Sequence, residues 1–255
     1  MSSEETDERL IYELPKADYV TLYEIPTPHI KEDSSTRYYV CDVSNMGEEH
    51  RSLRKRITGS IINAVLGESR FDTKDDAEEQ IKGKKSKEPN ENMLRGVRNE
   101  PVAIEWYSKF NNREVKRAGF GVSAEYLFLG GTPDGLTYDK DTNQNGLIEV
   151  KCPAKMYAPL VEKMIQELDD RWQDGYCEYK CEGSRKQTIY PPRHIWLSHY
   201  QQMQMYMAIW GRPWCDYIVY ASDSYVYQER VYCNNMYWEE HMLPGAIKFY
   251  EERLS

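Results

Sequence analysis

One short pattern constrains this chain more than any other. Pro133-Asp134-Gly135 precedes Glu149-Val150-Lys151, and fourteen residues separate Asp134 from Glu149. The second triplet lies in an apolar run that is typical of a strand. Because alternate side chains of a strand share a face, Glu149 and Lys151 project together while Val150 points into the core. If Asp134 lies at the mouth of the neighbouring strand, two carboxylates and an ammonium converge.

These groups have the chemistry of a divalent-cation site. The carboxylate oxygens of Asp134 and Glu149 are hard ligands that suit Mg²⁺ or Mn²⁺, and the backbone carbonyl of Val150 adds another oxygen. Lys151 could orient or deprotonate an attacking water, and its pKa would fall if it were desolvated. The pattern leaves a plainer alternative open, in which Pro133-Asp134-Gly135 is an ordinary turn and the strand exposes its Glu and Lys.

Two polar residues on apolar helix faces favour the site. An apolar stripe at a spacing of three to four residues predicts a helix over 93–110, and Glu100 lies on that stripe, facing inward. The stripe consists of Leu94, Val97, Ile104 and Tyr107. A second, largely apolar helix is predicted over 199–210 and contains Gln202 in an apolar neighbourhood. A carboxylate that faces the interior is costly unless it meets a cation.

The rest of the sequence predicts one α/β domain with a central mixed sheet flanked by helices. Residues 1–45 are predicted to be an N-terminal extension, residues 46–255 the domain itself, and residues 72–92 a charged, solvated stretch. The other expected elements are a helix capped near Thr58 to Ser60, an antiparallel hairpin of Tyr126–Leu129 with Leu147–Cys152, an amphipathic helix over 160–168, a strand over Asp216–Ala221 and a closing helix over Trp238–Arg253.

Composition narrows the class of protein. The chain has 255 residues, a mean hydropathy of −0.79 and no apolar run that approaches a membrane span. Its first residues do not resemble a signal peptide, so we expect an intracellular protein, in the host nucleus or cytoplasm and not secreted, with its six cysteines as thiols. The net charge of −9 opposes general adhesion to nucleic acid, so any site for a polyanion must be local.

Five motifs in a fixed order resemble one family. They are Thr58-Gly59-Ser60, Gly96-x-x-x-Glu100, Thr132-Pro133-Asp134-Gly135, Glu149-Val150-Lys151-Cys152-Pro153 and Tyr200-x-Gln202-x-Gln204. Over residues 50–253 the chain is similar to the lambda-type exonucleases, the YqaJ-like viral recombinase group of the PD-(D/E)XK, restriction-endonuclease-like superfamily. Each motif alone is weak, and the combination is specific.

The resemblance implies a two-metal nuclease centre. Asp134, Glu149 and the Val150 carbonyl would hold the catalytic Mg²⁺, for which Mn²⁺ can substitute, and Glu100 would help to hold a second ion. Lys151 would activate the attacking water. Gln202 would support that water or the lysine.

The resemblance also implies a pocket for a 5′-terminal phosphate, formed by Ser60, Thr132 and a nearby arginine. Leu53 stands where the family arginine is expected, so Arg54 or Arg51 would take that role. A basic run at this position is suited to phosphates. Between Lys151 and Gln202 the chain is also longer than the phage member of this family, the lambda exonuclease, with an insertion at about 160–195.

Family members degrade one strand of double-stranded DNA from its 5′ end, act with a single-strand annealing protein and, in the best-known case, form a ring-shaped trimer. The resemblance therefore implies a 5′ to 3′ exonuclease on linear double-stranded DNA, for recombination or for processing viral or mobile-element DNA. Two alternatives remain open: an endonuclease of the same superfamily, and a catalytically inactive nucleic-acid-binding module.

Two other metal patterns are weaker. Residues 141–146 match the start of an EF-hand loop, but Cys152 stands where a bidentate Glu is required, so a hairpin loop is favoured. Cys177 and Cys181 with His194 and His199 depart from the usual zinc spacing, and we expect these histidines to be structural or solvent-facing.

Overall fold

The computed structural model describes residues 38–41, 53–84, 91–123, 125–153, 195–222 and 225–255. The helix predicted over 160–168, nearly all of the insertion at about 160–195 and most of the extension at 1–45 lie outside these residues. Among the helices that are described, none combines the length and the apolar character that a membrane span requires.

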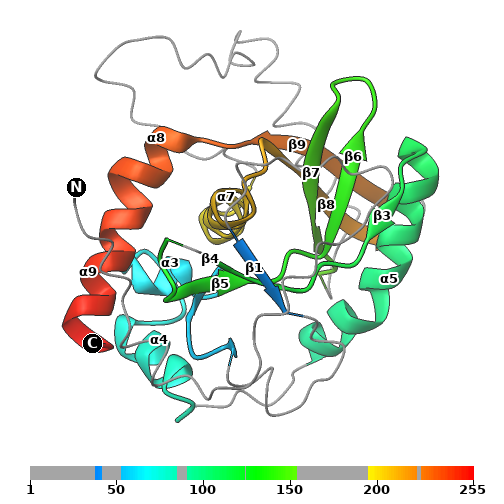
Figure 1. Ribbon diagram of the computed structural model, residues 1–255. Helices are drawn as coiled ribbons and strands as arrows, with labels where there is room; N and C mark the ends of the chain where they lie inside the picture. Colours follow the sequence, from blue (N-terminus) through cyan, green and yellow to red (C-terminus); the bar gives the residue numbers. More distant parts are fainter. Residues whose placement is uncertain (1–37, 42–52, 85–90, 124, 154–194, 223–224) are drawn as a thin grey trace, which may run out of the picture.

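The described strands form two mixed sheets (Figure 1). The four-stranded sheet has the order β1 (Tyr38–Cys41), β4 (Phe120–Ser123), β5 (Leu129–Gly131) and β2 (Ile57–Thr58). The five-stranded sheet has the order β3 (Val115–Lys116), β6 (Gly135–Asp139), β7 (Gln144–Lys151), β8 (Trp214–Ser222) and β9 (Tyr225–Tyr232). The predicted mixed sheet flanked by helices is therefore found as two sheets.

Helix α7 (Leu197–Trp210) lies between the two sheets and is seen nearly end-on in Figure 1. It contacts β4 and β5 on one side and β8 on the other. Because it is enclosed, it carries apolar residues around most of its circumference, and Met203, Met205 and Trp210 are fully buried. The helix ends at Gly211, whose φ of 57° is accessible to glycine at little cost.

Helix α5 (Glu91–Asn111) covers the outer face of the five-stranded sheet. Ala103 and Tyr107 are fully buried there. The prediction that the apolar face of this helix is buried is wrong for its first turns, since Leu94 is 43% exposed and Val97 is 73% exposed. The guanidinium of Arg95 donates to the carbonyls of Pro153, just after β7, and Ala221, near the end of β8. The first turns of the helix therefore lie at the edge of the sheet and have few strand residues beneath them.

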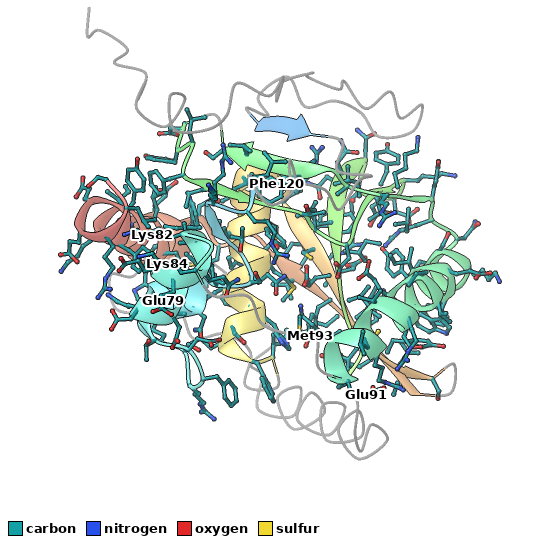
Figure 2. The ribbon with its side chains drawn as sticks, turned by 90° about the horizontal axis from the view of Figure 1, so that it is seen from below. Glu79, Lys82, Lys84, Glu91, Met93 and Phe120 are labelled. Carbon is teal, nitrogen blue, oxygen red and sulfur yellow. The ribbon has the colours of Figure 1, made fainter. Side chains whose placement is uncertain are left out.

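The remaining described helices lie on the side of α7 that is opposite to α5. In Figure 2, the labelled Glu79 and Lys82 mark α4 (Lys74–Ile81) on one side, and Glu91 and Met93 mark α5 on the other. These remaining helices are α3 (Ile62–Val65), α4, α8 (Asn235–Tyr237), the π-helix η1 (Trp238–Met242) and α9 (Leu243–Arg253). The predicted closing helix is thus divided between η1 and α9. The charged stretch contains α4, which begins with a capping box between Thr73 and Asp76.

Two predictions about strands and caps are wrong. Helix α3 begins after Ile61 without a side-chain cap, because Thr58 belongs to strand β2. The partner of β7 in the hairpin is β6, not Tyr126–Leu129, and Gly135 pairs with Ile148. The hairpin loop predicted in place of an EF-hand is confirmed, because residues 144–151 form strand β7.

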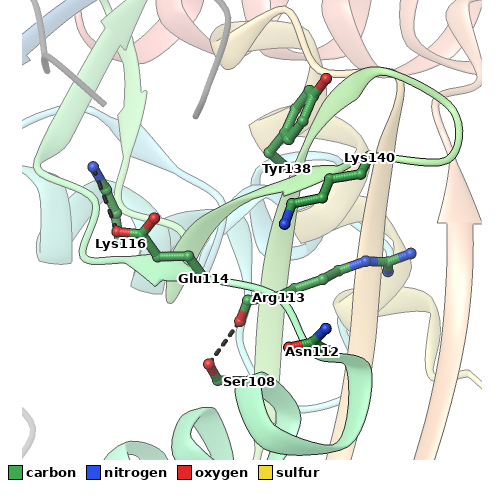
Figure 3. Close-up of a pocket in the computed structure, with 7 residues that line it drawn as sticks. All are labelled: Ser108, Asn112, Arg113, Glu114, Lys116, Tyr138 and Lys140. Carbon is green, nitrogen blue, oxygen red and sulfur yellow. Dashed lines mark hydrogen bonds and ion pairs between the residues drawn. The ribbon is translucent and has the colours of Figure 1, made fainter. Parts of the chain in front are cut away.

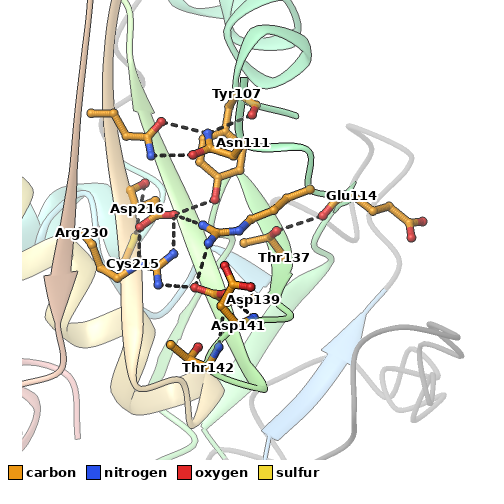
Figure 4. A network of polar contacts seen from close by, with 12 residues as sticks. Tyr107, Asn111, Glu114, Thr137, Asp139, Asp141, Thr142, Cys215, Asp216 and Arg230 are labelled. Atoms are coloured by element: carbon orange, nitrogen blue, oxygen red, sulfur yellow. Dashed lines mark hydrogen bonds and ion pairs between the residues drawn. The ribbon is translucent and has the colours of Figure 1, made fainter. Parts of the chain in front are cut away.

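A buried ionic network ties β6, β8 and β9 together (Figure 4). Asp139 and Asp216 are almost fully buried, and the guanidinium of Arg230 lies 2.5 Å from Asp139 and 2.8 Å from Asp216. Arg113 bridges the same two carboxylates at 2.8 and 3.4 Å. Burial alone would raise the pKa of Asp139, but the hydrogen bond from Arg230 and the charge of both arginines lower it. Two cations therefore balance two buried anions.

We predict that Arg230→Met lowers the free energy of unfolding by about 3 kcal/mol, because it leaves two buried carboxylates with one arginine. Urea unfolding measures this change. The control is Lys248→Met, which removes an exposed pair with Glu252 and should cost less than about 0.5 kcal/mol. Equal, small losses in both variants would contradict the role assigned to the network.

Candidate active site

Asp134, Glu149 and Lys151 meet where β6 begins and β7 ends. The pairing of Gly135 with Ile148 places Asp134 beside the end of β7, and the amide of Val150 donates to Asp134 Oδ2 at 2.6 Å. Lys151 Nζ donates to Glu149 Oε1 at 2.5 Å, so the two side chains share a face as strand alternation predicts. Val150 is buried on the other face. The convergence predicted from the sequence is present.

Gln202 joins this group from helix α7. Its side-chain oxygen accepts a hydrogen bond from Lys151 Nζ at 3.0 Å, and its amide nitrogen donates to the hydroxyl of Tyr206 at 3.4 Å. The polar residue in an apolar helix therefore has a specific partner. Lys151 is held between a carboxylate of its own strand and an amide of α7.

The charges in this centre are strongly coupled. Glu149 is 1% exposed, and burial followed by the negative charge of Asp134 raises its pKa. Burial also raises the pKa of Asp134. For Lys151, burial lowers the pKa but the charges of Glu149 and Asp134 overcome it and the pKa is raised. Desolvation lowers this pKa as expected, but the net pKa is raised because two carboxylates lie against the ammonium.

One oxygen of Glu149 is left without a partner. Glu149 Oε2 is buried and accepts no hydrogen bond from the described part of the chain. A buried carboxylate oxygen in this state is costly unless a cation satisfies it. Together with the carboxylate of Asp134, this oxygen fits a hard divalent cation. Within the described residues, no three His, Cys, Asp or Glu side chains are grouped closely enough to hold an ion by themselves.

Glu100 lies farther from the pair, on helix α5. It is half-buried, and burial followed by the charge of Asp134 raises its pKa to about 7, while Arg117 and Lys151 oppose the change. Its carboxylate thus senses the centre electrostatically. It does not join Asp134 and Glu149 in one preformed ligand group.

Two of the segments predicted to bind a terminal phosphate approach the centre, since Gly59 and Gly131 both pack against Tyr206 of helix α7. Strands β2 and β5 are parallel and pair Thr58 with Gly130, so Ser60 and Thr132 follow neighbouring strand ends. Ser60 is exposed at the surface, and its hydroxyl lies 3.1 Å from that of Thr58. Arg54 is also exposed, whereas Arg51 lies outside the described residues.

Sequence reasoning missed Tyr206. A β-carbon at Gly59 would lie 2.6 Å from its ring, and one at Gly131 would also clash with it. The close packing of this tyrosine therefore explains why both positions are glycine. Burial and the charge of Glu149 raise its pKa, and Arg54 acts in the opposite direction. Its spacing of four residues from Gln202 is the signal that could have found it.

His199 is half-buried rather than solvent-facing. Its Nδ1 lies 2.9 Å from the hydroxyl of Tyr217, and burial followed by the charge of Lys151 lowers its pKa to about 3. The ring is neutral near pH 7. The other three residues of the disfavoured zinc pattern, Cys177, Cys181 and His194, lie outside the described residues.

A surface pocket of about 410 Å³ lies at the other end of the β6–β7 hairpin (Figure 3). Its lining includes Arg113, Lys116, Tyr138 and Lys140. The hairpin separates it from Asp134 and Lys151, and Arg113 is already committed to the ionic network. We therefore place the candidate active site at the carboxylate pair rather than in this pocket.

The fold is shared with solved nuclease structures. The crystal structure of an alkaline exonuclease, LHK-Exo, from Laribacter hongkongensis is 24% identical, with 81% of this chain and 92% of that chain covered and a TM-score of 0.56. The crystal structure of LHK-Exo in complex with dAMP is 22% identical, with 79% and 89% covered and a TM-score of 0.55. These similarities confirm the predicted restriction-endonuclease-like fold class.

A family model adds a direct sequence match. The YqaJ-like viral recombinase domain matches residues 50–213, and the chain belongs to this family. The resemblance inferred from the five motifs is confirmed. Among curated proteins, none matches the chain.

We predict that Asp134→Asn stabilises the cation-free protein and abolishes its response to Mg²⁺. The change removes a buried charge that opposes ionisation of Glu149, while the amide oxygen can still accept from the Val150 amide. In the wild type, Mg²⁺ at a hundred times its Kd should stabilise the fold by about 2.7 kcal/mol.

Thermal unfolding in EDTA and in a Mg²⁺ series measures both effects. Asp141→Asn in the exposed hairpin loop is the matched control and should behave as wild type. A similar Mg²⁺ response in wild type and Asp134→Asn would refute a cation site at this carboxylate.

Proposed function

We propose that this protein is a metal-dependent deoxyribonuclease, specifically a 5′ to 3′ exonuclease on linear double-stranded DNA. The observation that carries the proposal is the buried, unpartnered Oε2 of Glu149 near Asp134, while Lys151 bonds to the other oxygen of Glu149 and to Gln202. Membership of the viral recombinase family supports this function. So does the shared fold with an alkaline exonuclease that has been crystallised with dAMP, a deoxynucleoside monophosphate.

The carboxylates would hold Mg²⁺, or Mn²⁺ in its place. Asp134, Glu149 and the Val150 carbonyl form the proposed first ligand set, and Glu100 would help to hold a second ion. When bound, the two ions would stabilise negative charge on the attacking and leaving oxygens of the phosphodiester. The raised pKa of Glu100 fits a carboxyl group that lacks such a counter-charge.

Lys151 and Gln202 would position the attacking water. As an ammonium, Lys151 donates to Glu149 and Gln202 and retains a third hydrogen for a water or a phosphate oxygen. The two nearby carboxylates raise its pKa, so Lys151 accepts a proton from water only when their charge is offset. Gln202, held by Tyr206, fixes the direction of the lysine.

The end of the substrate would be recognised at the strand ends of β2 and β5. Ser60 and Thr132 supply hydroxyls there, and Arg54 supplies the positive charge that a 5′-phosphate requires, with Arg51 as the other candidate. A single-strand annealing protein and assembly into a ring-shaped trimer are further proposals from the family. The endonuclease alternative shares the same chemistry, and the inactive module is disfavoured because both central carboxylates are present.

We predict that linear double-stranded DNA with a 5′ label and Mg²⁺ releases labelled mononucleotide first, whereas a 3′ label is released late. A closed circle should stay intact because an exonuclease requires an end. Gel and thin-layer analysis of the products distinguishes these outcomes. Cleavage of the circle at the same rate would favour the endonuclease, and no release from any substrate would refute nuclease activity.

We predict that Lys151→Met lowers kcat by about 100-fold or more, the cost of losing a positioned proton-transfer group. Cation affinity should be unchanged or higher, since a positive charge next to the carboxylates is lost. Single-turnover cleavage and calorimetric titration with Mn²⁺ measure the two quantities. A parallel loss of cation affinity would show that Lys151 serves the ligand set rather than the water.

We predict that Arg54→Ala reduces the preference for a 5′-phosphorylated over a 5′-hydroxyl end by about tenfold, the loss of one charge-assisted hydrogen bond. Competition between the two ends in one reaction measures this preference directly. Lys55→Ala, its exposed neighbour, is the matched control. An unchanged preference in Arg54→Ala would place the phosphate contact elsewhere.

A further inference from the structure

An exposed tryptophan lies at the start of helix α7, the helix that supplies Gln202 to the candidate active site. Trp196 immediately precedes helix α7 and is 58% exposed, although it is the residue type with the largest apolar surface. Exposure of a large aromatic side chain is informative when it lies beside a functional site. Trp196 is six residues before Gln202, which corresponds to about 9 Å along the helix axis.

The ring of Trp196 is supported from behind. It stacks on His199 with ring centroids 5.7 Å apart and an interplanar angle of 14°. His199 in turn is held by the hydroxyl of Tyr217 at 2.9 Å, and Tyr217 is buried. A chain of three rings therefore leads from the sheet to the surface. The outermost ring is preorganised because its inner face is already stacked.

The same chain of rings borders the catalytic group. Tyr217 pairs with Glu149 between the parallel strands β7 and β8. His199 and Gln202 are three residues apart on α7 and so lie on one face of the helix. Lys151 hydrogen-bonds to Gln202 and influences His199 electrostatically. The three rings thus connect the surface at Trp196 with the helix face and the strand that surround Lys151.

We propose that Trp196 is a stacking platform for an unpaired nucleobase next to the phosphodiester that is cleaved. This inference rests on the proposed function, since it is the nuclease reaction that brings a DNA strand to Lys151. Every nucleobase has a flat aromatic face, so one exposed indole binds any sequence. The platform holds the strand by its base, whereas Lys151, Ser60 and Arg54 act on its phosphates.

The first experiment measures binding without cleavage. In EDTA, the Kd for a duplex with a short 5′-phosphorylated overhang is measured by fluorescence anisotropy. Trp196→Ala should weaken binding about 5- to 100-fold, the range for loss of one base–aromatic stack. Trp196→Phe should retain most of the affinity. Tyr232→Ala is the control, because Tyr232 is 60% exposed but pairs with Trp214 at the far end of the same sheet.

The second experiment tests stacking itself. An abasic site is introduced at each position of the overhang in turn, for wild type and Trp196→Ala. At one position the wild type should lose about as much affinity as Trp196→Ala does, and the variant should lose no more. A structural role for Trp196 would not produce this dependence on one base.

The outcomes separate the platform from the nuclease. Unchanged Kd in Trp196→Ala, losses equal to those of Tyr232→Ala, no recovery in Trp196→Phe, or abasic effects that multiply with the variant at every position would each overturn the platform. Absence of Mg²⁺-dependent cleavage in the wild type would instead overturn the proposed function, whatever the binding data show.

Discussion

The burial of two carboxylates side by side, Asp134 and Glu149, governs the rest of this structure. Burial disfavours the charged form of both groups, and the charge of Asp134 raises the pKa of Glu149 further. Lys151 offsets part of this charge through one oxygen of Glu149, while the other oxygen is buried without a partner in the described part of the chain. The divalent cation that we propose for this centre would offset the remaining negative charge.

Helix α7 connects this centre to the rest of the molecule. Packed between the two sheets, it supplies Gln202 to Lys151 and places the ring of Tyr206 against Gly59 and Gly131. Those glycines belong to the strand ends proposed to bind a terminal phosphate. One buried helix therefore sets the distance between Lys151 and the proposed phosphate-binding strand ends, which the proposed exonuclease would require.

Local patterns predicted the polar centre better than they predicted the surrounding fold. Alternation along one strand was enough to pair Glu149 with Lys151, and the position of an amide among apolar residues of a helix identified Gln202. The inward stripe on α5 failed at Leu94 and Val97 because periodicity gives a helix face but not the extent of the sheet beneath it. Strand β6 was missed because Gly135–Asp139 has no clear alternation and depends on pairing with β7.

The sequence by itself determined which polar groups form the candidate site, because strand and helix periods fix which side chains share a face. It also determined the family, because five weak motifs in one order form a specific combination. Only the tertiary structure decided the electrostatics: the raised pKa of Lys151, the unpartnered oxygen of Glu149 and the ionic network of Asp139 and Asp216. These depend on distances between segments far apart in the chain and on the exclusion of water, which no local pattern encodes.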